Sequence, residues 1–286
     1  GRSGFLAARP LAVAALVLAA FGLLTTQAHG QETELVVVPA VAYGLPGFDT
    51  NLWTSEIYFS NPTPVRADAT FEAILPGSTT PPDTWSSCPW TGPWTLHVNP
   101  ESSKRYAMGS DLCGAEEAVG AYVFRVNKGM VVSSRMVNHD PEAIASCCEL
   151  LAGFGTEIPG IPLDELPAAG AHLLPALVWH PDRCGGRAFD TYVGFANPFE
   201  EEVHVVLALA GDSADPAVDT LPRQLTVPGL SWQQIYLRPP DSDAAACRSP
   251  RMFDLRVEID GPVAIYAPVV DRSRQDGRVV LPLPIE

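Results

Sequence analysis

Three tryptophans lie within ten residues of one another, at Trp85, Trp90 and Trp94, in a segment rich in proline, serine and threonine. Aromatic rings exposed on a loop can stack on the flat apolar faces of sugars or anchor a protein partner. The same rings can instead fold over one end of a β-structure and form a small satellite core. We favour packing as the interpretation and keep ligand binding by this loop as the alternative.

Six cysteines are the other side chains with obvious chemistry. Neither a CxxC pair nor a Cys/His cluster with zinc-ligand spacing occurs among them, so disulfides are a better interpretation than metal ligands if the chain is exported. A redox switch at the adjacent Cys147 and Cys148 is the sharper alternative. The disulfide candidates are Cys88, Cys113, Cys147, Cys148, Cys184 and Cys247.

Motifs for catalysis are missing from the sequence, which has no G-x-S-x-G, HExxH, P-loop or G-x-G-x-x-G pattern. Ser133, Ser134, His139 and Asp140 cluster in sequence and could form a hydrolytic set. A triad depends on a geometry that closeness in sequence does not supply, so a polar strand end is the preferred interpretation. We therefore predict a protein that is not an enzyme and uses no cofactor or catalytic metal.

Acidic turns in the C-terminal half offer oxygen ligands of the kind that calcium prefers. Asp212, Asp215 and Asp219 lie in one such turn, and Asp241 and Asp243 lie in another. They lack the D-x-D-x-D-G loop pattern, so solvated turns are the preferred interpretation and a structural calcium site is the alternative.

The first thirty residues have the three-part pattern of a secretory signal peptide: Arg2 and Arg9, an apolar stretch at 11–24, and small residues that end at Gly30. We expect cleavage after Gly30. Fourteen apolar residues span only about 21 Å as a helix, less than the roughly 30 Å hydrocarbon core, so an uncleaved anchor is the weaker alternative. The sequence predicts a secreted, periplasmic or cell-surface protein.

The charge of the chain restricts its partners. The net charge is −15, and removal of Arg2 and Arg9 with the signal peptide would take it to −17. An acidic surface repels phosphate backbones and anionic lipid headgroups. We therefore expect a protein or glycan partner at the cell exterior, no nucleic acid, and no membrane contact beyond an uncleaved N-terminal segment.

An internal repeat organises the remaining residues. The segment at 36–43 (VVVPAVAY) resembles that at 172–179 (HLLPALVW), which places Pro39 opposite Pro175 at an offset of 136. Further downstream, Arg125-Val126 aligns with Arg256-Val257 at an offset of 131, rising to 132 after one extra turn residue. The offset of 136 also aligns Ile57 with Val193, Phe59 with Phe195, Asn61 with Asn197, Pro62 with Pro198, Phe71 with Leu207 and Ala73 with Leu209.

Both halves of the repeat have the pattern of β-strands. Short runs at 54–60 and 191–196 are rich in aromatic and β-branched residues and stop at Asn-Pro, while 203–210 is apolar enough for a central strand. Tyr122, Phe124 and Val126 alternate with Val123 and Arg125, as expected when one face of a sheet is buried. The turns at 127–129 (NKG) and 260–261 (DG) predict positive φ for a tight hairpin. Only 141–151 is a candidate for a short helix.

About seven short strands per repeat predict an all-β fold of two tandem immunoglobulin-like or fibronectin-type β-sandwiches after the signal peptide. We place the signal peptide at 1–30, the first domain at 31–162, a linker at 163–170 and the second domain at 171–286. The repeat resembles the tandem immunoglobulin-like modules of secreted bacterial proteins, at Pro39-Ala40, the strand 57–62 and the segment 129–135 (GMVVSSR). This resemblance implies a fold and export, and no activity.

The repeat also narrows the cysteine pairing. Cys113 and Cys247 precede matching strands, and the second domain offers Cys247 only Cys184 as a partner. We therefore predict Cys184–Cys247, and we favour Cys88–Cys113 in the first domain. The remaining adjacent pair would make a strained disulfide, so pairings of either member with Cys88 or Cys113 stay open.

Together these patterns favour an exported, non-enzymatic structural or adhesion-type interaction protein. A carbohydrate-binding module that uses the tryptophan loop is the alternative function.

Overall fold

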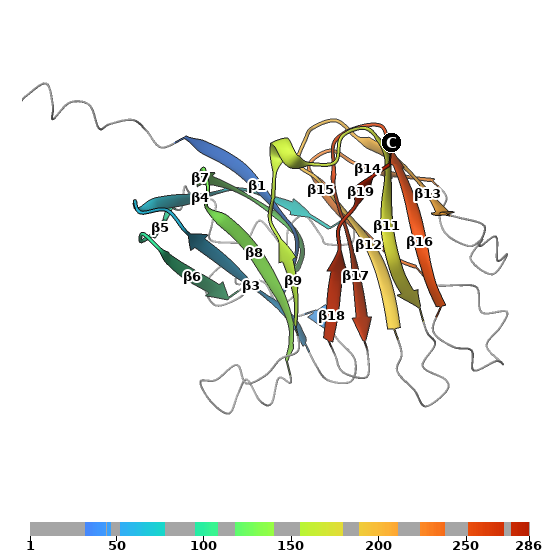
Figure 1. Cartoon of the computed structure of the whole chain (residues 1–286), viewed down its shortest axis with the longest axis horizontal. Coiled ribbons are helices and arrows are strands. Elements are labelled where there is room, and N and C mark those ends of the chain that lie inside the picture. Colours follow the sequence, from blue (N-terminus) through green and yellow to red (C-terminus); the bar gives the residue numbers. More distant parts are fainter. Residues whose placement is uncertain are drawn as a thin grey trace, which may run out of the picture. The chain divides into compact units, whose positions relative to one another are not determined.

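A computed structural model describes residues 32–43, 45–46, 52–77, 95–107, 118–139, 155–179, 189–210, 224–237, 251–271 and 276–285 (Figure 1). Thr33–Glu286 form one compact unit. The predicted signal peptide at 1–30 and the predicted helix at 141–151 lie outside the described residues. In the residues that are described, no helix is long and apolar enough to cross a membrane.

The described residues are nearly all in β-strands. The only helical element among them is the 3-10 helix η1 (Leu163–Glu165). The strands are β1 (Thr33–Tyr43), β2 (Leu45–Pro46), β3 (Leu52–Asn61), β4 (Ala67–Pro76), β5 (Thr95–Val98), β6 (Ser102–Ala107), β7 (Ala118–Asn127), β8 (Val131–His139), β9 (Gly155–Pro159), β10 (Ile161–Pro162), β11 (Gly170–Trp179), β12 (Phe189–Asn197), β13 (Val203–Ala210), β14 (Gln224–Val227), β15 (Ser231–Tyr236), β16 (Arg251–Ile259), β17 (Ala264–Asp271), β18 (Asp276–Val280) and β19 (Leu283–Pro284).

The strands form four antiparallel sheets, and their order repeats. The N-terminal sheet pair consists of β10-β1-β7-β4-β5 and of β2-β3-β8-β9, with β6 also paired to β3. The C-terminal sheet pair consists of β19-β11-β16-β13-β14 and of β15-β12-β17-β18. Replacing β1 by β11, β3 by β12, β7 by β16 and so on converts the first order into the second, apart from the two-residue strand β2, which has no equivalent among the described strands. The two halves therefore share one topology, and β13 is an interior strand as its apolar sequence predicted.

Each sheet pair buries a hydrophobic core between its two sheets. In the N-terminal pair, Tyr122, Phe124 and Val126 of β7 face inward and are at most 1% exposed. Phe59 of β3 meets Phe124 edge to face, with ring centroids 5.0 Å apart and planes at 88°, a geometry that aromatic pairs prefer. The C-terminal pair has a separate core that includes Phe195, Leu207, Leu255, Val257 and Ile265. The fold is therefore all-β and sandwich-like.

Strand register confirms the predicted offset of 136 and corrects the offset downstream. Both β1 and β11 shift register at equivalent positions, between Val38 and Val41 and between Leu174 and Leu177. Val126 pairs with Ala69, whereas Ile259 pairs with Val205, and 69 and 205 differ by 136. Val126 is therefore equivalent to Ile259, at an offset of 133, and the predicted alignment of Arg125-Val126 with Arg256-Val257 was wrong by two residues. A slip of two keeps every side chain on the same face, so the alternating pattern does not reveal it.

The two hairpin turns differ, contrary to the prediction of positive φ in both. Gly129 has φ of 89°, and the amide of Met130 donates to the carbonyl of Asn127. Neither Asp260 nor Gly261 has positive φ. The loop between β16 and β17 spans 260–263, one residue more than that between β7 and β8. The longer loop does not need the left-handed conformation of a tight turn.

A third hydrophobic cluster joins the two sheet pairs. Val123 is 6% exposed although it points away from the N-terminal core, because it packs with Trp232 and Tyr266 of the C-terminal pair. The prediction that only one face of β7 is buried was therefore incomplete. Leu166, in the segment predicted as a linker at 163–170, also belongs to this cluster. A Cβ built on Gly277 of β18 would lie 2.5 Å from the Thr156 hydroxyl of β9, so these two edge strands approach closely.

Candidate functional site

The structure does not describe the site residues that the sequence predicted. Trp85, Trp90 and Trp94 lie outside it, and so do the six disulfide candidates Cys88, Cys113, Cys147, Cys148, Cys184 and Cys247 and the acidic turns at 212–219 and 241–243. These predictions remain predictions. Within the described ranges, no group of three or more His, Cys, Asp or Glu is placed to hold a metal ion.

The serines considered for a hydrolytic set have other surroundings. Ser134 is fully buried, and its hydroxyl donates to the carbonyl of Ala40 at 3.0 Å. Ser133 is half-buried and, as the next residue of the same strand, faces the other side of the sheet. The side chain of His139 and the whole of Asp140 lie outside what the structure describes. Ser134 therefore acts as a structural donor, and it lies in the interior of β8 rather than at a strand end.

The internal repeat separates structural polar contacts from candidates for function. A contact that recurs at equivalent positions in both sheet pairs serves the common fold. A contact that occurs in one pair only needs another explanation. Three polar clusters of the N-terminal pair can be judged in this way.

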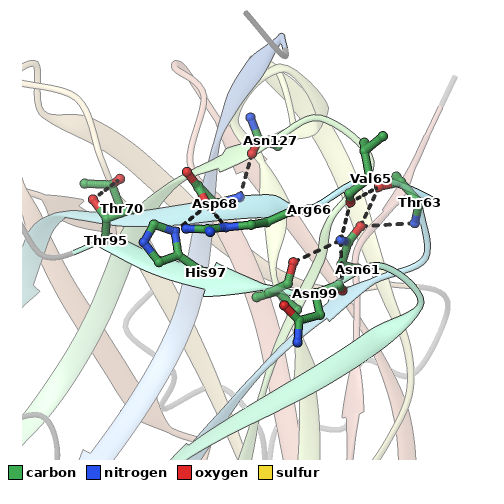
Figure 2. Close-up of polar contacts among 11 residues, drawn as sticks. Asn61, Thr63, Val65, Arg66, Asp68, Thr70, Thr95, His97, Asn99 and Asn127 are labelled. Carbon is green, nitrogen blue, oxygen red and sulfur yellow. Dashed lines mark hydrogen bonds and ion pairs between the residues drawn. The ribbon is translucent and has the colours of Figure 1, made fainter.

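The first cluster, around Asn61, is structural (Figure 2). The side-chain amide nitrogen of Asn61 donates to the carbonyls of Val65, Val98 and Asn99 at 2.8, 3.2 and 3.1 Å. Asn197 repeats this arrangement, donating to the carbonyls of Glu201, Val227 and Pro228 at 2.7, 3.4 and 3.1 Å. Both side chains are at most 1% exposed. The Asn-Pro signal in the sequence therefore marks a buried amide that ties a strand end to the neighbouring hairpin.

The second cluster lies beside it and is also partly repeated (Figure 2). Asp68 of β4 contacts His97 of β5 through Oδ1 and Nδ1, 2.7 Å apart, and both side chains are about half exposed at 47% and 50%. The equivalent cross-strand pair in the C-terminal half is His204 with Thr226, at 3.1 Å. Exposed cross-strand pairs of this kind stabilise a sheet modestly. We assign this cluster to strand pairing.

The third cluster, centred on Glu56, has no counterpart and is the candidate site. Glu56 and Tyr58 lie on the outer face of β3, where the register sets Tyr58 opposite Arg105 of β6 and Glu56 opposite Arg135 of β8. The Tyr58 hydroxyl donates to Glu56 Oε2 at 2.5 Å, and Arg105 Nη1 donates to Glu56 Oε1 at 3.2 Å. At the equivalent positions of the C-terminal pair stand Tyr192, Gly194 and Gln234, which cannot build this network.

Burial makes this network more than a solvated face. The Glu56 side chain is 5% exposed, whereas that of Arg105 is 51% exposed. A buried carboxylate is costly unless it is paired and hydrogen-bonded, and here both oxygens are engaged. Burial, followed by the hydrogen bond to Glu56, raises the pKa of Tyr58 above its usual value, so its hydroxyl stays protonated and donates. Glu56 therefore holds the Tyr58 ring and the Arg105 guanidinium in fixed positions.

Serines surround this network where the C-terminal pair has apolar side chains. Ser60, Ser103 and Ser133 occupy the same outer face as Tyr58, and the hydroxyls of Ser60 and Ser103 are 2.8 Å apart. The equivalent residues are Ala196, Trp232 and Tyr266, all of which pack in the cluster between the sheet pairs. One sheet face thus has an apolar version that docks inside the molecule and a more polar version, on which Val131 is an exposed apolar side chain. We call the polar version, on β6-β3-β8-β9, the Glu56 face.

The C-terminal pair has one related contact at a different place. Tyr236 donates its hydroxyl hydrogen to Asp190 Oδ1 at 2.5 Å, and Asp190 is 4% exposed. The tyrosine lies on β15 and the carboxylate on β12, whereas in the N-terminal pair both belong to β3. A buried carboxylate that positions a tyrosine is therefore common to both halves, but the guanidinium and the serines are not.

Comparison of the chain with known protein families, with curated proteins and with solved structures finds no match to any of them. The site therefore has to be interpreted from its own geometry.

The chemistry of the Glu56 face suits binding better than catalysis. Both oxygens of Glu56 already accept hydrogen bonds from its neighbours, and burial and the bond to Glu56 raise the pKa of Tyr58, which keeps its hydroxyl protonated. The guanidinium of Arg105 can still donate from its other N–H groups. No motif in the sequence predicted this site. The available signal was Glu56, an acid at an alternating position within the aromatic and β-branched run 54–60.

Proposed function

We propose that the protein is an exported, non-enzymatic structural or interaction protein of the adhesion type. It is built of tandem immunoglobulin-like or fibronectin-type β-sandwiches held in a fixed arrangement, with the Glu56 face as its contact surface. Its place of action is the cell exterior, as a secreted, periplasmic or cell-surface protein.

The buried contact around Trp232 carries this proposal. Trp232 is 6% exposed, and its indole N–H lies 2.8 Å from the carbonyl oxygen of Pro39 and 2.9 Å from the Tyr266 hydroxyl. Gly77, the residue after β4, forms a β-bridge with Trp232 itself. Apolar packing combined with a hydrogen-bonded buried donor favours a single orientation of the two sheet pairs relative to each other. A rigid tandem of this kind suits a spacer or an adhesive arm better than an enzyme that must open and close.

Backbone relaxation by NMR tests the rigid arrangement on the chain that lacks residues 1–30. We expect amides of β1–β10 and of β11–β19 to report one common rotational correlation time and one diffusion tensor. Two distinct correlation times would contradict the proposal. Trp232→Ala supplies the matched comparison, because it removes the central side chain and should give the two halves independent motion.

Export is tested separately. Residues 1–30 fused to a reporter enzyme that is active only outside the cytoplasm should give an active reporter, and a fusion with 11–24 deleted should not. Activity in neither fusion would overturn the exported part of the proposal.

A further inference from the structure

The Glu56 face presents the exposed guanidinium of Arg105 as a hydrogen-bond donor, beside serine hydroxyls that can donate and accept. The acceptors of Glu56 are used internally by Tyr58 and Arg105. Arg105 has five N–H groups on its guanidinium, and only its bond to Glu56 involves another side chain of this face. A surface with surplus donors matches a ligand that is rich in acceptors.

Charge points in the same direction. The exposed ionic groups of this face are Arg105, Arg135 and Glu157, the last opposite Arg135 in the register of β8 and β9. Glu56 is almost fully buried, so the exposed ionic groups of this face carry a net positive charge, although the whole chain carries −15. Guanidinium groups bind carboxylates through two parallel hydrogen bonds. At physiological salt the Debye length is about 8 Å, so the distant acidic surface is screened while a direct contact persists.

The aromatic ring selects among anionic ligands. Tyr58 is half-buried and fixed by its bond to Glu56, and its neighbours on the face include the short side chains of Ser60 and Ser133. The two serines are too short to cover the tyrosine ring, whereas Arg105, directly opposite Tyr58 on β6, supplies a guanidinium beside it. An apolar ring face bordered by hydroxyls and guanidiniums complements a sugar, which has an apolar face and a rim of hydroxyls. An acidic peptide could pair with the guanidinium groups but would not match a flat apolar ring with hydroxyls around it.

We propose that the Glu56 face binds a carboxylate-bearing saccharide of the uronic-acid type. The Arg105 guanidinium pairs with the sugar carboxylate, the Tyr58 ring contacts the apolar face of the sugar, and Glu56 is a positioning residue. This inference rests on the proposed interaction function and names the chemistry of its partner.

Titration calorimetry of the chain without residues 1–30 tests this, with oligogalacturonate, a neutral oligosaccharide of equal length and a poly-glutamate peptide as probes. We expect saturable binding of oligogalacturonate alone. Tyr58→Ala and Arg105→Gln should each weaken it about tenfold or more, as loss of a charge-assisted contact does. Arg105→Lys keeps a positive charge beside Glu56 but removes the planar fork, so it should fold normally and still bind more weakly.

Arg256→Gln is the matched control, because Arg256 is an exposed arginine paired with Glu258 at 2.6 Å on another sheet. It should leave binding unchanged. The proposal is overturned if no probe binds, if poly-glutamate binds as well as the saccharide, or if Arg256→Gln has the same effect as Arg105→Gln. It is also overturned if Trp90→Ala alone abolishes binding, since the tryptophan loop would then be the sugar site. All these outcomes are independent of the relaxation experiment on Trp232.

Discussion

The indole nitrogen of Trp232 lies 2.8 Å from the carbonyl oxygen of Pro39, 193 residues earlier in the chain. The residue equivalent to Trp232 in the N-terminal pair is Ser103, whose hydroxyl contacts Ser60 instead. The exchange of tryptophan for serine at equivalent positions therefore distinguishes the sheet face that docks within the molecule from the one that does not. The exchange is reciprocal, because Val123, which belongs to the same hydrophobic cluster as Trp232, is equivalent to Arg256, which pairs with Glu258.

Trp232→Phe should lower the free energy of unfolding by about 2–4 kcal/mol, since it leaves a smaller ring in a buried site and deprives the Pro39 carbonyl of its donor. Equilibrium denaturation in urea measures this. Trp53→Phe is the matched control, because Trp53 is only half-buried and lies outside the three hydrophobic clusters. Equal losses in the two variants would contradict the central role of Trp232.

Gly194→Ala should destabilise the protein by about 1–3 kcal/mol or more, the usual cost of overpacking. A Cβ at this position would overlap the ring of Tyr266, which is fully buried and hydrogen-bonded to Trp232 and Gln234. The ring therefore has no room to retreat. Gly261→Ala is the control, because its Cβ would meet only a methyl group of Val203 at 3.2 Å. Thermal unfolding should show a lower melting temperature for the first variant and little change for the second.

The sequence predicted the strands well because their signals are local. Alternation at 122–126, Asn-Pro stops at 61–62 and 197–198, and an apolar run at 203–210 each reflect the burial of one strand. The all-β class and the repeated strand order follow from them. The register of β7 against β16 was not accessible in this way, because a slip of two residues conserves the alternation.

The docked face and the Glu56 face were hidden for a different reason. Val123 looks the same in sequence whether its face meets water or another sheet, and only the three-dimensional contact with Trp232 distinguishes the two. Glu56 reads as an exposed acid on a strand, since its partners Tyr58 and Arg105 come from positions two and 49 residues away. The docked face and the Glu56 face both depend on contacts between segments that are distant in the sequence. Such contacts do not form a recognisable motif in a single sequence.

Asn61→Asp and Asn197→Asp should each cost about 2–4 kcal/mol. The substitution keeps the shape and the acceptor oxygen but removes the amide donor, leaving buried carbonyls such as those of Val98 and Val227 without it. Asn99→Asp is the control, since Asn99 is exposed. Because the two buried asparagines are equivalent, similar losses are expected, measured by urea denaturation. An unchanged free energy of unfolding for either variant would show that the amide of that asparagine does not stabilise the fold shared by the two halves.

Alkaline titration should reveal raised pKa values for at least three of the tyrosines that the structure describes. Burial raises the pKa of Tyr122 and Tyr266 well above the usual 10.0, and burial with the Glu56 hydrogen bond raises that of Tyr58. A phenol with a higher pKa in the folded state keeps its proton when the unfolded chain has lost it. Its contribution to stability is therefore complete below pH 10 and declines as pH rises through the folded pKa.

We thus expect the ultraviolet absorbance of tyrosinate to rise in two phases as pH increases. The late phase should coincide with the loss of the circular dichroism of the sheets, since the buried phenols of Tyr122 and Tyr266 ionise as the protein unfolds. Tyr58→Phe should remove one tyrosine that ionises above the usual pKa of 10.0 and leave that late phase in place. Reversible ionisation of all seven tyrosines near pH 10, with the sheets intact, would show that Tyr58 is not held by Glu56 and that the two core tyrosines are open to water.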